Sequence, residues 1–274
     1  MLETPHVQTA PNGLTVVLLP RDSGQTALIA LDVGVGSRHE SVQDSGLSHV
    51  LEHLVFHGSP SHPTVAEVDA AAEAMGAAFD ASTGRASTRL EHWMDPRHLQ
   101  TSAELLAELV RAPRFTGLDT ERAVILEEAL DEYDEKGRLV DCEALARRAL
   151  WPDHGLGRSI IGFLPNIERF TLEDLRRHHE TYYRAGNMVL TVAGPLPLET
   201  LAKAAEPFMA LPAGEVPATA PAPPPPDRPQ FILVDDGRSQ CDCRMAWWAP
   251  GGHDPDAPAF ELLMRALDDG LASR

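Results

Sequence analysis

The 274-residue sequence predicts a fold that combines β-strands and α-helices, followed by a linker and the start of a second domain. Short stretches rich in Val, Ile, Leu and Thr have the composition of strands. Longer stretches repeat apolar residues at three- and four-residue spacing, which is typical of helices. A Pro- and Ala-rich stretch at residues 212–230 has no apolar pattern to bury, so we expect an extended, semi-rigid linker there.

The first strands are expected at residues 13–20 and 26–36, which are separated by a polar turn. The segment 77–94 is rich in Ser and Thr and lacks helical periodicity. It therefore predicts two strands around a turn near Gly84. Another strand is expected at residues 187–196, where Val and Leu again dominate.

The predicted helices carry recognisable start and stop signals. The segment 64–76 ends at Gly76, and the segment 95–113 begins with Asp95 as a cap. The segment 171–183 opens with a Thr-x-x-Asp pattern that resembles a capping box. The remaining helices are expected at residues 46–59, at 118–151 with a break near Gly137, and at 197–211.

The segment after the linker repeats the element order seen near the start of the chain. Strands are expected at residues 231–236 and 241–252, and a helix at 256–271. This order suggests the opening of a second copy of the first domain, in a chain that is a fragment or that another chain completes. The predicted division is a first domain, a linker and a truncated second domain, at residues 1–211, 212–230 and 231–274.

Composition excludes several classes of protein. The chain has 23 basic and 41 acidic residues, a net charge of −18, so we expect no nucleic-acid partner. No apolar run approaches the roughly 18 residues that a membrane span needs. The first residues lack a basic region followed by an apolar stretch, so no signal peptide is predicted and a cytoplasmic location is expected.

The stretch GLSHVLEHLVFHGS, residues 46–59, carries a candidate metal site. On a helix, His49, Glu52 and His53 share one face because residues three and four apart are neighbours. Two imidazoles at this spacing can bind one zinc ion. The glutamate between them would lie beside the metal, where a general base must be to take a proton from a zinc-activated water.

A third protein ligand is expected on a different element, because a catalytic zinc usually has three. The otherwise apolar segment ERAVILEEAL offers Glu121, Glu127 and Glu128. Glu121 and Glu128 are two helical turns apart and therefore share a face, whereas Glu127 is rotated toward solvent. For the other histidines we expect surface or capping roles, namely His57, His92, His154, His178, His179 and His253.

These residues resemble the signature of the inverzincin metallopeptidases, the family of pitrilysin, insulin-degrading enzyme and the mitochondrial processing peptidase. Their His-x-x-Glu-His motif matches His49, Glu52 and His53. In that family a glutamate about 75 residues on completes the zinc site, and Glu128 stands 75 positions after His53. A second family glutamate lies seven positions earlier, where this sequence has Glu121.

The resemblance implies an α+β fold, with an antiparallel or mixed sheet and helices packed mainly on one face, duplicated across the linker. It implies a zinc-dependent endopeptidase with one Zn2+ per chain, held by His49, His53 and Glu128. Glu52 would be the general base, and Glu121 would support a ligand from behind. A peptide substrate would be added as a further strand along Asp80, Ala81, Ser82 and Thr83.

The resemblance also implies a partner. The family's second half supplies further substrate-binding residues and closes a chamber that admits unfolded peptides. We therefore expect a homodimer, or a heterodimer with a complementary peptidase-like half, for full activity. The alternative is a non-catalytic zinc-binding or scaffold subunit of a peptidase complex. Asp80 departs from the family's usual Asn, which removes an amide donor and adds a charge.

Overall fold

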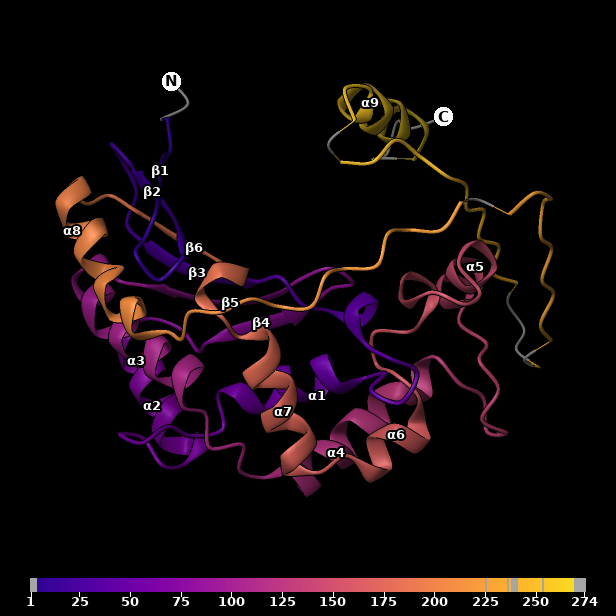
Figure 1. Cartoon of the computed structure of the whole chain (residues 1–274), viewed down its shortest axis with the longest axis horizontal. Coiled ribbons are helices and arrows are strands. Elements are labelled where there is room, and N and C mark those ends of the chain that lie inside the picture. Colours follow the sequence, from indigo (N-terminus) through magenta and orange to yellow (C-terminus); the bar gives the residue numbers. More distant parts are fainter. Residues whose placement is uncertain (1–3, 225, 236, 238–240, 253, 269–274) are drawn as a thin grey trace.

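The computed structural model describes residues 4–224, 226–235, 237, 241–252 and 254–268 (Figure 1). Its strands are β1 His6–Thr9, β2 Thr15–Pro20, β3 Ala27–Val33, β4 Asp80–Thr83, β5 Thr88–Met94 and β6 Met188–Gly194. Its helices are α1 Leu47–Val55, α2 Val65–Met75, α3 Leu99–Arg111, α4 Leu118–Glu128, α5 Cys142–Leu150, α6 Leu164–Arg169, α7 Leu172–Tyr182, α8 Leu198–Ala204 and α9 Ala257–Asp268.

The strands form one mixed sheet in the order β1-β2-β6-β3-β5-β4. The β2–β6 pair is parallel and the other pairs are antiparallel. Strands β2 and β3 follow one another in sequence but are not neighbours, because β6 lies between them. Leu31 in the middle of β3 pairs with Leu90 on one side and Leu190 on the other, so this row of the sheet is apolar across three strands.

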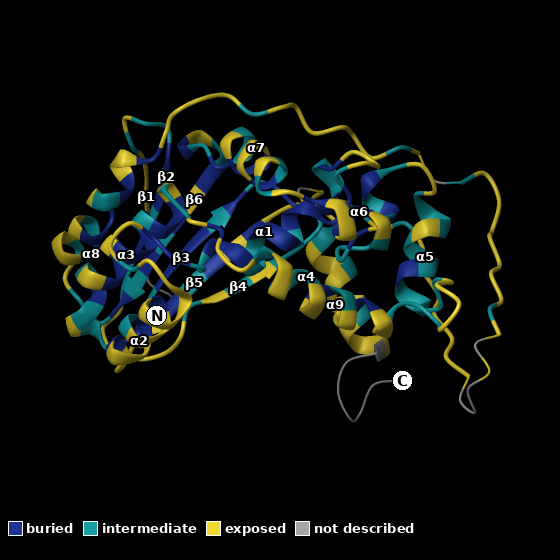
Figure 2. Ribbon diagram, turned by 90° about the horizontal axis from the view of Figure 1, so that it is seen from below, coloured by how far each residue is buried: buried dark blue, intermediate teal, exposed yellow. Residues whose placement is uncertain are grey.

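Helices cover one face of this sheet, which confirms the predicted α+β class. In Figure 1, α1, α2, α3 and α7 lie below the sheet, and no described helix packs on the opposite face. The burial of β5 alternates accordingly: Leu90 and Met94 are buried, whereas Trp93 is 49% exposed. Figure 2 shows the same division, with buried residues concentrated between the helices and the sheet.

The predicted helix starts and stops are largely confirmed. Helix α2 stops at Met75, just before Gly76, as predicted, and the structure shows in addition that Thr64 caps its start by accepting a hydrogen bond from the Glu67 main-chain N–H. Asp95 accepts from the Arg97 N–H and begins the turn before α3. Thr171 and Asp174 form a reciprocal capping box at the start of α7.

The predicted helix over 118–151 is interrupted more extensively than expected. Helix α4 ends at Glu128, and α5 begins only at Cys142. Between them the chain turns back, so that Tyr133 and Leu139 pair as an isolated bridge. The Asp134 carboxylate fixes this turn, because it accepts hydrogen bonds from the Lys136 and Arg138 main-chain N–H groups.

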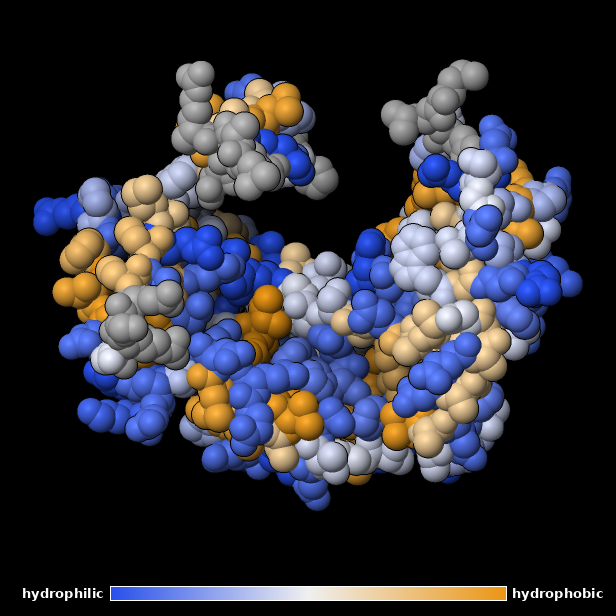
Figure 3. All heavy atoms as spheres, turned by 180° about the vertical axis from the view of Figure 1, so that it is seen from behind, coloured by the Kyte–Doolittle hydropathy of each residue, from blue (hydrophilic) through white to orange (hydrophobic). Residues whose placement is uncertain are grey.

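The strands expected after the linker are not formed by the described residues 231–235 and 241–252, while Asp236 lies outside the described residues. An extended segment becomes a strand only when it pairs with a neighbouring strand, and these described residues pair with none. The expected helix is present as α9, and its residues 269–271 lie outside the described residues. Figure 3 shows that the molecule is hollowed between α9 and the sheet.

Residues 212–252 contact the preceding part of the chain at several places, among them an ion pair between Arg244 and Glu143. In the linker, the Thr219 hydroxyl lies 3.0 Å from His39 Nε2, and the Ala220 carbonyl accepts from Arg38. Farther on, the Trp248 ring packs against Trp151, with ring centroids 5.4 Å apart.

No helix within the described ranges combines the length and apolar character that crossing a bilayer requires.

Candidate metal centre

Helix α1 is held at its N-terminus by a buried carboxylate. The two oxygens of Glu40 accept hydrogen bonds from the main-chain N–H groups of Gly46 and Ser48, at 2.8 and 2.7 Å. A negative charge at this end also complements the helix dipole. Gly46 is required here, because its φ is +102° and a Cβ would meet the Ile161 carbonyl oxygen at 2.5 Å. The motif that follows is therefore fixed in direction from its first turn.

The two faces of α1 divide by polarity. Its apolar side chains are fully buried against the sheet and neighbouring helices, including Leu47, Val50, Leu51 and Leu54. His49, Glu52 and His53 occupy the other side, where α1 contacts α4 and β4. The helical spacing of the sequence thus brings the three polar side chains together, as predicted.

The imidazoles of α1 meet the end of α4. His49 Nε2 and His53 Nε2 are 3.3 Å apart, and Glu128 Oε2 lies 3.8 Å from the first and 3.6 Å from the second. In the part of the chain that the structure describes, these three side chains form the one group of His, Cys, Asp or Glu residues able to share a metal ion. Glu128 is 43% exposed at its side chain, so the group opens to solvent on that side.

These separations fit zinc. A tetrahedral zinc with bonds of about 2.0–2.1 Å separates its ligand atoms by about 3.3–3.4 Å. The ligand atoms of His49, His53 and Glu128 are at or slightly beyond that spacing. Three protein ligands leave a fourth position for water, which is the pattern of catalytic rather than structural zinc.

Glu121 lies behind the site and orients one ligand. Its Oε2 is 3.0 Å from His53 Nδ1. A carboxylate can only accept, so Nδ1 carries the proton and Nε2 presents its lone pair to the metal position. Nδ1 of His49, by contrast, is buried and has no hydrogen-bond partner among the described residues. His53 is therefore the histidine that the protein holds in place.

Burial prepares two side chains for chemistry. It lowers the pKa of His49 to about 4, with a smaller contribution from His53, so the His49 ring is neutral and able to bind a metal at pH 7. Burial also raises the pKa of the Glu52 carboxyl, and the neighbouring Thr83 and His53 oppose that rise. A raised carboxyl pKa brings a general base closer to the working pH.

The glutamates of α4 are arranged as the sequence predicted. Glu121 lies in the first turn and Glu128 at the last residue, two turns apart on the face toward α1. Glu127 is exposed and takes no part in the group. Ile125 is buried and anchors the helix between them.

The segment Asp80–Thr83 is the edge strand β4, which pairs on one side with β5. The hydrogen bond from Gly84 N–H to the Ser87 carbonyl sets the alternation of the ladder. The main-chain groups of Ala81 and Thr83 consequently point to the unpaired side. Thr83 lies beside Glu52. The free edge of the sheet therefore begins next to the candidate site.

Several histidines differ from the surface or capping roles expected for them. His92, His178 and His179 are buried, and each makes an internal hydrogen bond. His154 does cap a short turn by accepting from Leu156 N–H. His253 lies outside the described residues, and His57 lies beside Glu121. No sequence pattern indicates these positions. The partners of His57, His178 and His179 are 59 or more positions away in the chain, and the partners of His92 are a serine hydroxyl and a main-chain carbonyl.

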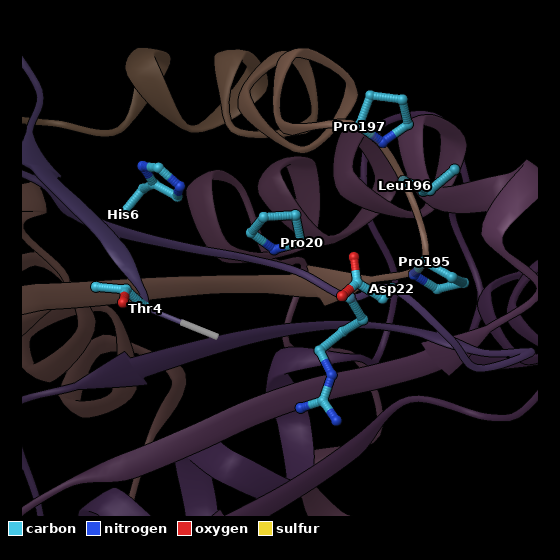
Figure 4. Close-up of a pocket in the computed structure, with 8 residues that line it drawn as sticks. Thr4, His6, Pro20, Asp22, Pro195, Leu196 and Pro197 are labelled. Carbon is cyan, nitrogen blue, oxygen red and sulfur yellow. The ribbon is translucent and has the colours of Figure 1, made fainter. Parts of the chain in front are cut away.

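A surface hollow lies at the other end of the sheet and is separate from this site. It is lined by residues at the ends of β1, β2 and β6, among them His6, Pro20, Asp22 and Pro195 (Figure 4). The sheet order places β1 and β2 at the opposite edge from β4. Three of its eight lining residues are prolines, and it contributes no group to the metal centre.

The chain is similar to known proteins over most of its length. The model of the insulinase family (peptidase family M16) matches residues 16–162. The model of the peptidase M16 inactive domain matches residues 169–274. A probable mitochondrial-processing peptidase subunit beta of Schizosaccharomyces pombe is 33% identical over 202 residues, which are 73% of this chain and 44% of that protein.

An uncharacterized zinc protease of Mycobacterium leprae is 33% identical over 189 residues, 68% of this chain and 42% of that protein. The chain thus spans about half the length of the relatives that it matches. A Helicobacter pylori protease superposes with a TM-score of 0.72 at 25% identity, covering 82% of this chain and 55% of that one. For pitrilysin the TM-score is 0.68 at 25% identity, with 80% and 24% covered.

Proposed function

We propose that this chain, which belongs to the insulinase family (peptidase family M16), is the zinc-binding half of an endopeptidase that hydrolyses peptides or unfolded segments. The observation that carries this proposal is the convergence of His49, His53 and Glu128 at zinc-like separations, with Glu121 fixing the His53 tautomer. Relatives named as zinc proteases support the choice of metal.

The residues of the chain divide the chemistry among them. A zinc ion held by His49, His53 and Glu128 would supply a water activated near neutral pH and a positive charge for the peptide carbonyl. Glu52 takes the proton of the attacking water, holds it on its carboxyl and delivers it to the leaving amine. The partial burial of Glu52 favours this role, since it raises the pKa of the carboxyl that must keep the proton between the two transfers.

The edge strand β4 would receive the substrate. A peptide that pairs with Ala81 through main-chain hydrogen bonds extends the sheet and needs little side-chain recognition. Its backbone would then run past Thr83 and Glu52 toward the metal. Asp80 Oδ1 accepts from the Ala81 N–H at 3.0 Å, so this donor is held near the free edge until a peptide takes its place.

We further propose that a complementary half is needed for full activity, supplied by a second copy or by a related chain. Large apolar side chains of the tail are exposed, with Phe231 at 89%, Leu233 at 81% and Leu262 at 68%. Exposed apolar side chains of this size are candidates for a partner surface. One structural relative is the first half of the periplasmic protease PqqL from Escherichia coli, which is 25% identical.

The test combines zinc content with peptide cleavage. We expect about one zinc per chain by elemental analysis of the wild type, and loss of zinc in His53→Ala. Glu127→Ala, on the exposed side of α4, is the matched control and should keep the metal. Glu52→Gln should also keep the metal but reduce cleavage of a quenched fluorescent peptide by about 10²–10⁴-fold.

Each outcome separates the alternatives. Zinc with cleavage that depends on Glu52 supports an enzyme in its own right. Zinc without cleavage supports a half-enzyme that needs its complement. A folded wild-type chain without zinc would overturn the metallopeptidase proposal and leave the non-catalytic scaffold subunit.

A further inference from the structure

We propose that His57 is a positioning residue of the metal centre, which holds Glu121 so that Glu121 can hold His53. This inference rests on the proposed function, because it concerns how tightly the site would keep zinc. His57 lies one turn beyond His53, where its main-chain N–H still bonds to the Leu54 carbonyl. It thus continues the face of α1 that carries His49 and His53.

The His57 ring is clamped by the segment that leads into α4. Its Nδ1 lies 2.9 Å from the Thr116 carbonyl oxygen, and the Thr116 hydroxyl donates to the His57 carbonyl at 2.7 Å. Gly117 has a φ of +84°, and a Cβ there would approach His57 Nδ1 to 3.3 Å. Phe115, which is buried, takes a φ of +53°. Such conformations are sparse for residues other than glycine and persist where the surroundings require them.

This clamp determines what the other ring nitrogen can do. A carbonyl only accepts, so Nδ1 is committed as a donor to Thr116. The ring therefore turns Nε2 toward Glu121, whose Oε1 is 3.7 Å away. This places a ring nitrogen of His57 within salt-bridge range of the Glu121 carboxylate. The side chains of His57 and Glu121 are each 16% exposed, so water competes weakly for this contact.

The two oxygens of Glu121 then face two different histidines. Oε2 accepts from His53 Nδ1, and Oε1 faces His57 Nε2. Without His57, the carboxylate could rotate about its last bond and release His53. His49 has no comparable support, since its Nδ1 has no hydrogen-bond partner among the described residues. Of the two histidines, only His53 is thus held by a side chain, the Glu121 carboxylate, and His57 fixes the orientation of that carboxylate.

Two substitutions separate positioning from simple packing. In His57→Gln, the amide nitrogen falls near the place of Nε2 and can still donate to Glu121. In His57→Asn, it falls near the place of Nδ1 and can donate only to Thr116. We would load each variant with zinc and follow metal transfer to a chelating dye. Melting of the metal-free proteins would report on folding independently.

We expect zinc loss from His57→Asn and His57→Ala to be about tenfold faster than from the wild type. This is the lower end of the range of effects found for residues that orient metal ligands. His57→Gln should stay within about twofold of wild type. In a Glu121→Ala background the His57 substitutions should have no further effect, because the carboxylate through which His57 acts is gone.

The opposite result would overturn the inference. If Asn retains zinc and Gln does not, His57 serves only the Thr116 clamp. If all variants release zinc like the wild type, or if Gln loses it as fast as Ala, His57 does not position Glu121. These results leave the proposed function intact, because they require a wild type that binds zinc. A wild type without zinc would instead reject the proposed function and this inference with it.

Discussion

The Glu40 carboxylate accepts a hydrogen bond from the main-chain N–H of Ser48 at 2.7 Å, and both residues are buried. Ser48 directly precedes His49 in the sequence. The second oxygen of Glu40 accepts from Gly46. An acidic side chain six residues before the N-cap Gly46 therefore replaces the usual capping side chain and fixes the first turn of the helix that carries the candidate metal ligands.

Replacing Glu40 should destabilise this helix. In Glu40→Ala, the N–H groups of Gly46 and Ser48 would remain buried without an acceptor, which costs about 1–3 kcal/mol for each group. We expect the free energy of unfolding, measured by urea denaturation, to fall by about 3 kcal/mol. Glu40→Gln keeps one acceptor oxygen and should lose less. A change below about 0.5 kcal/mol in both variants would contradict this account.

A buried histidine should make stability depend on pH. Burial lowers the pKa of His178 to about 4, and its Nε2 lies 3.0 Å from the Ser48 hydroxyl. Above pH 6.5 the ring is neutral in the folded and unfolded states. As the pH falls from 6.5 toward 4, the unfolded chain takes up the proton before the folded chain does, so the free energy of unfolding decreases.

The size of this effect follows from the pKa difference. Between pH 7.5 and pH 5, the wild type should lose about 2 kcal/mol more free energy of unfolding than His178→Gln, whose amide can still bond to Ser48. Comparing variants cancels the opposite trend of buried carboxyls such as Glu40, whose pKa burial raises. His6→Gln, at an exposed position, is the control. Parallel pH profiles for wild type and His178→Gln would rule the effect out.

The free edge of β4 should matter for substrate rather than for folding. Ala81→Pro removes an N–H that points away from β5, and edge positions tolerate proline. One lost main-chain hydrogen bond of about 1 kcal/mol should raise KM about fivefold and leave kcat nearly unchanged. Asp80→Asn, which keeps the N–H of Ala81, serves as the comparison. An unchanged KM in Ala81→Pro would exclude this strand as the substrate edge.

The exposed apolar residues of the tail should drive association. We expect sedimentation velocity to show concentration-dependent dimers or larger species in the wild type. The double substitution Phe231→Ser and Leu233→Ser should reduce this association, because it removes two of the most exposed apolar side chains. Val124→Ser, an exposed valine of α4, should not. A wild type that stays monomeric at every concentration would count against pairing through this tail.

The sequence was sufficient for features that depend on neighbours along the chain. Capping at Thr171 follows from a side chain that reaches the third residue ahead. The shared face of His49, Glu52 and His53 follows from the helical repeat. Glu121 and Glu128 were found through their spacing, which a family resemblance made specific. The division into domains at residue 211 and the cytoplasmic location stay predictions.

The tertiary structure decided what depends on distant neighbours. Strand β6 lies between β2 and β3. His92, His178 and His179 are buried, and each makes a hydrogen bond to a partner that no local sequence pattern predicts. The tertiary structure also left the expected strands after the linker unpaired. Glu121 lies 64 positions after His57 in the sequence. The two side chains meet because α4 begins against the end of α1. Local hydrogen bonds and side-chain periodicity are encoded within a few residues, whereas packing partners are chosen only when the whole chain is compact.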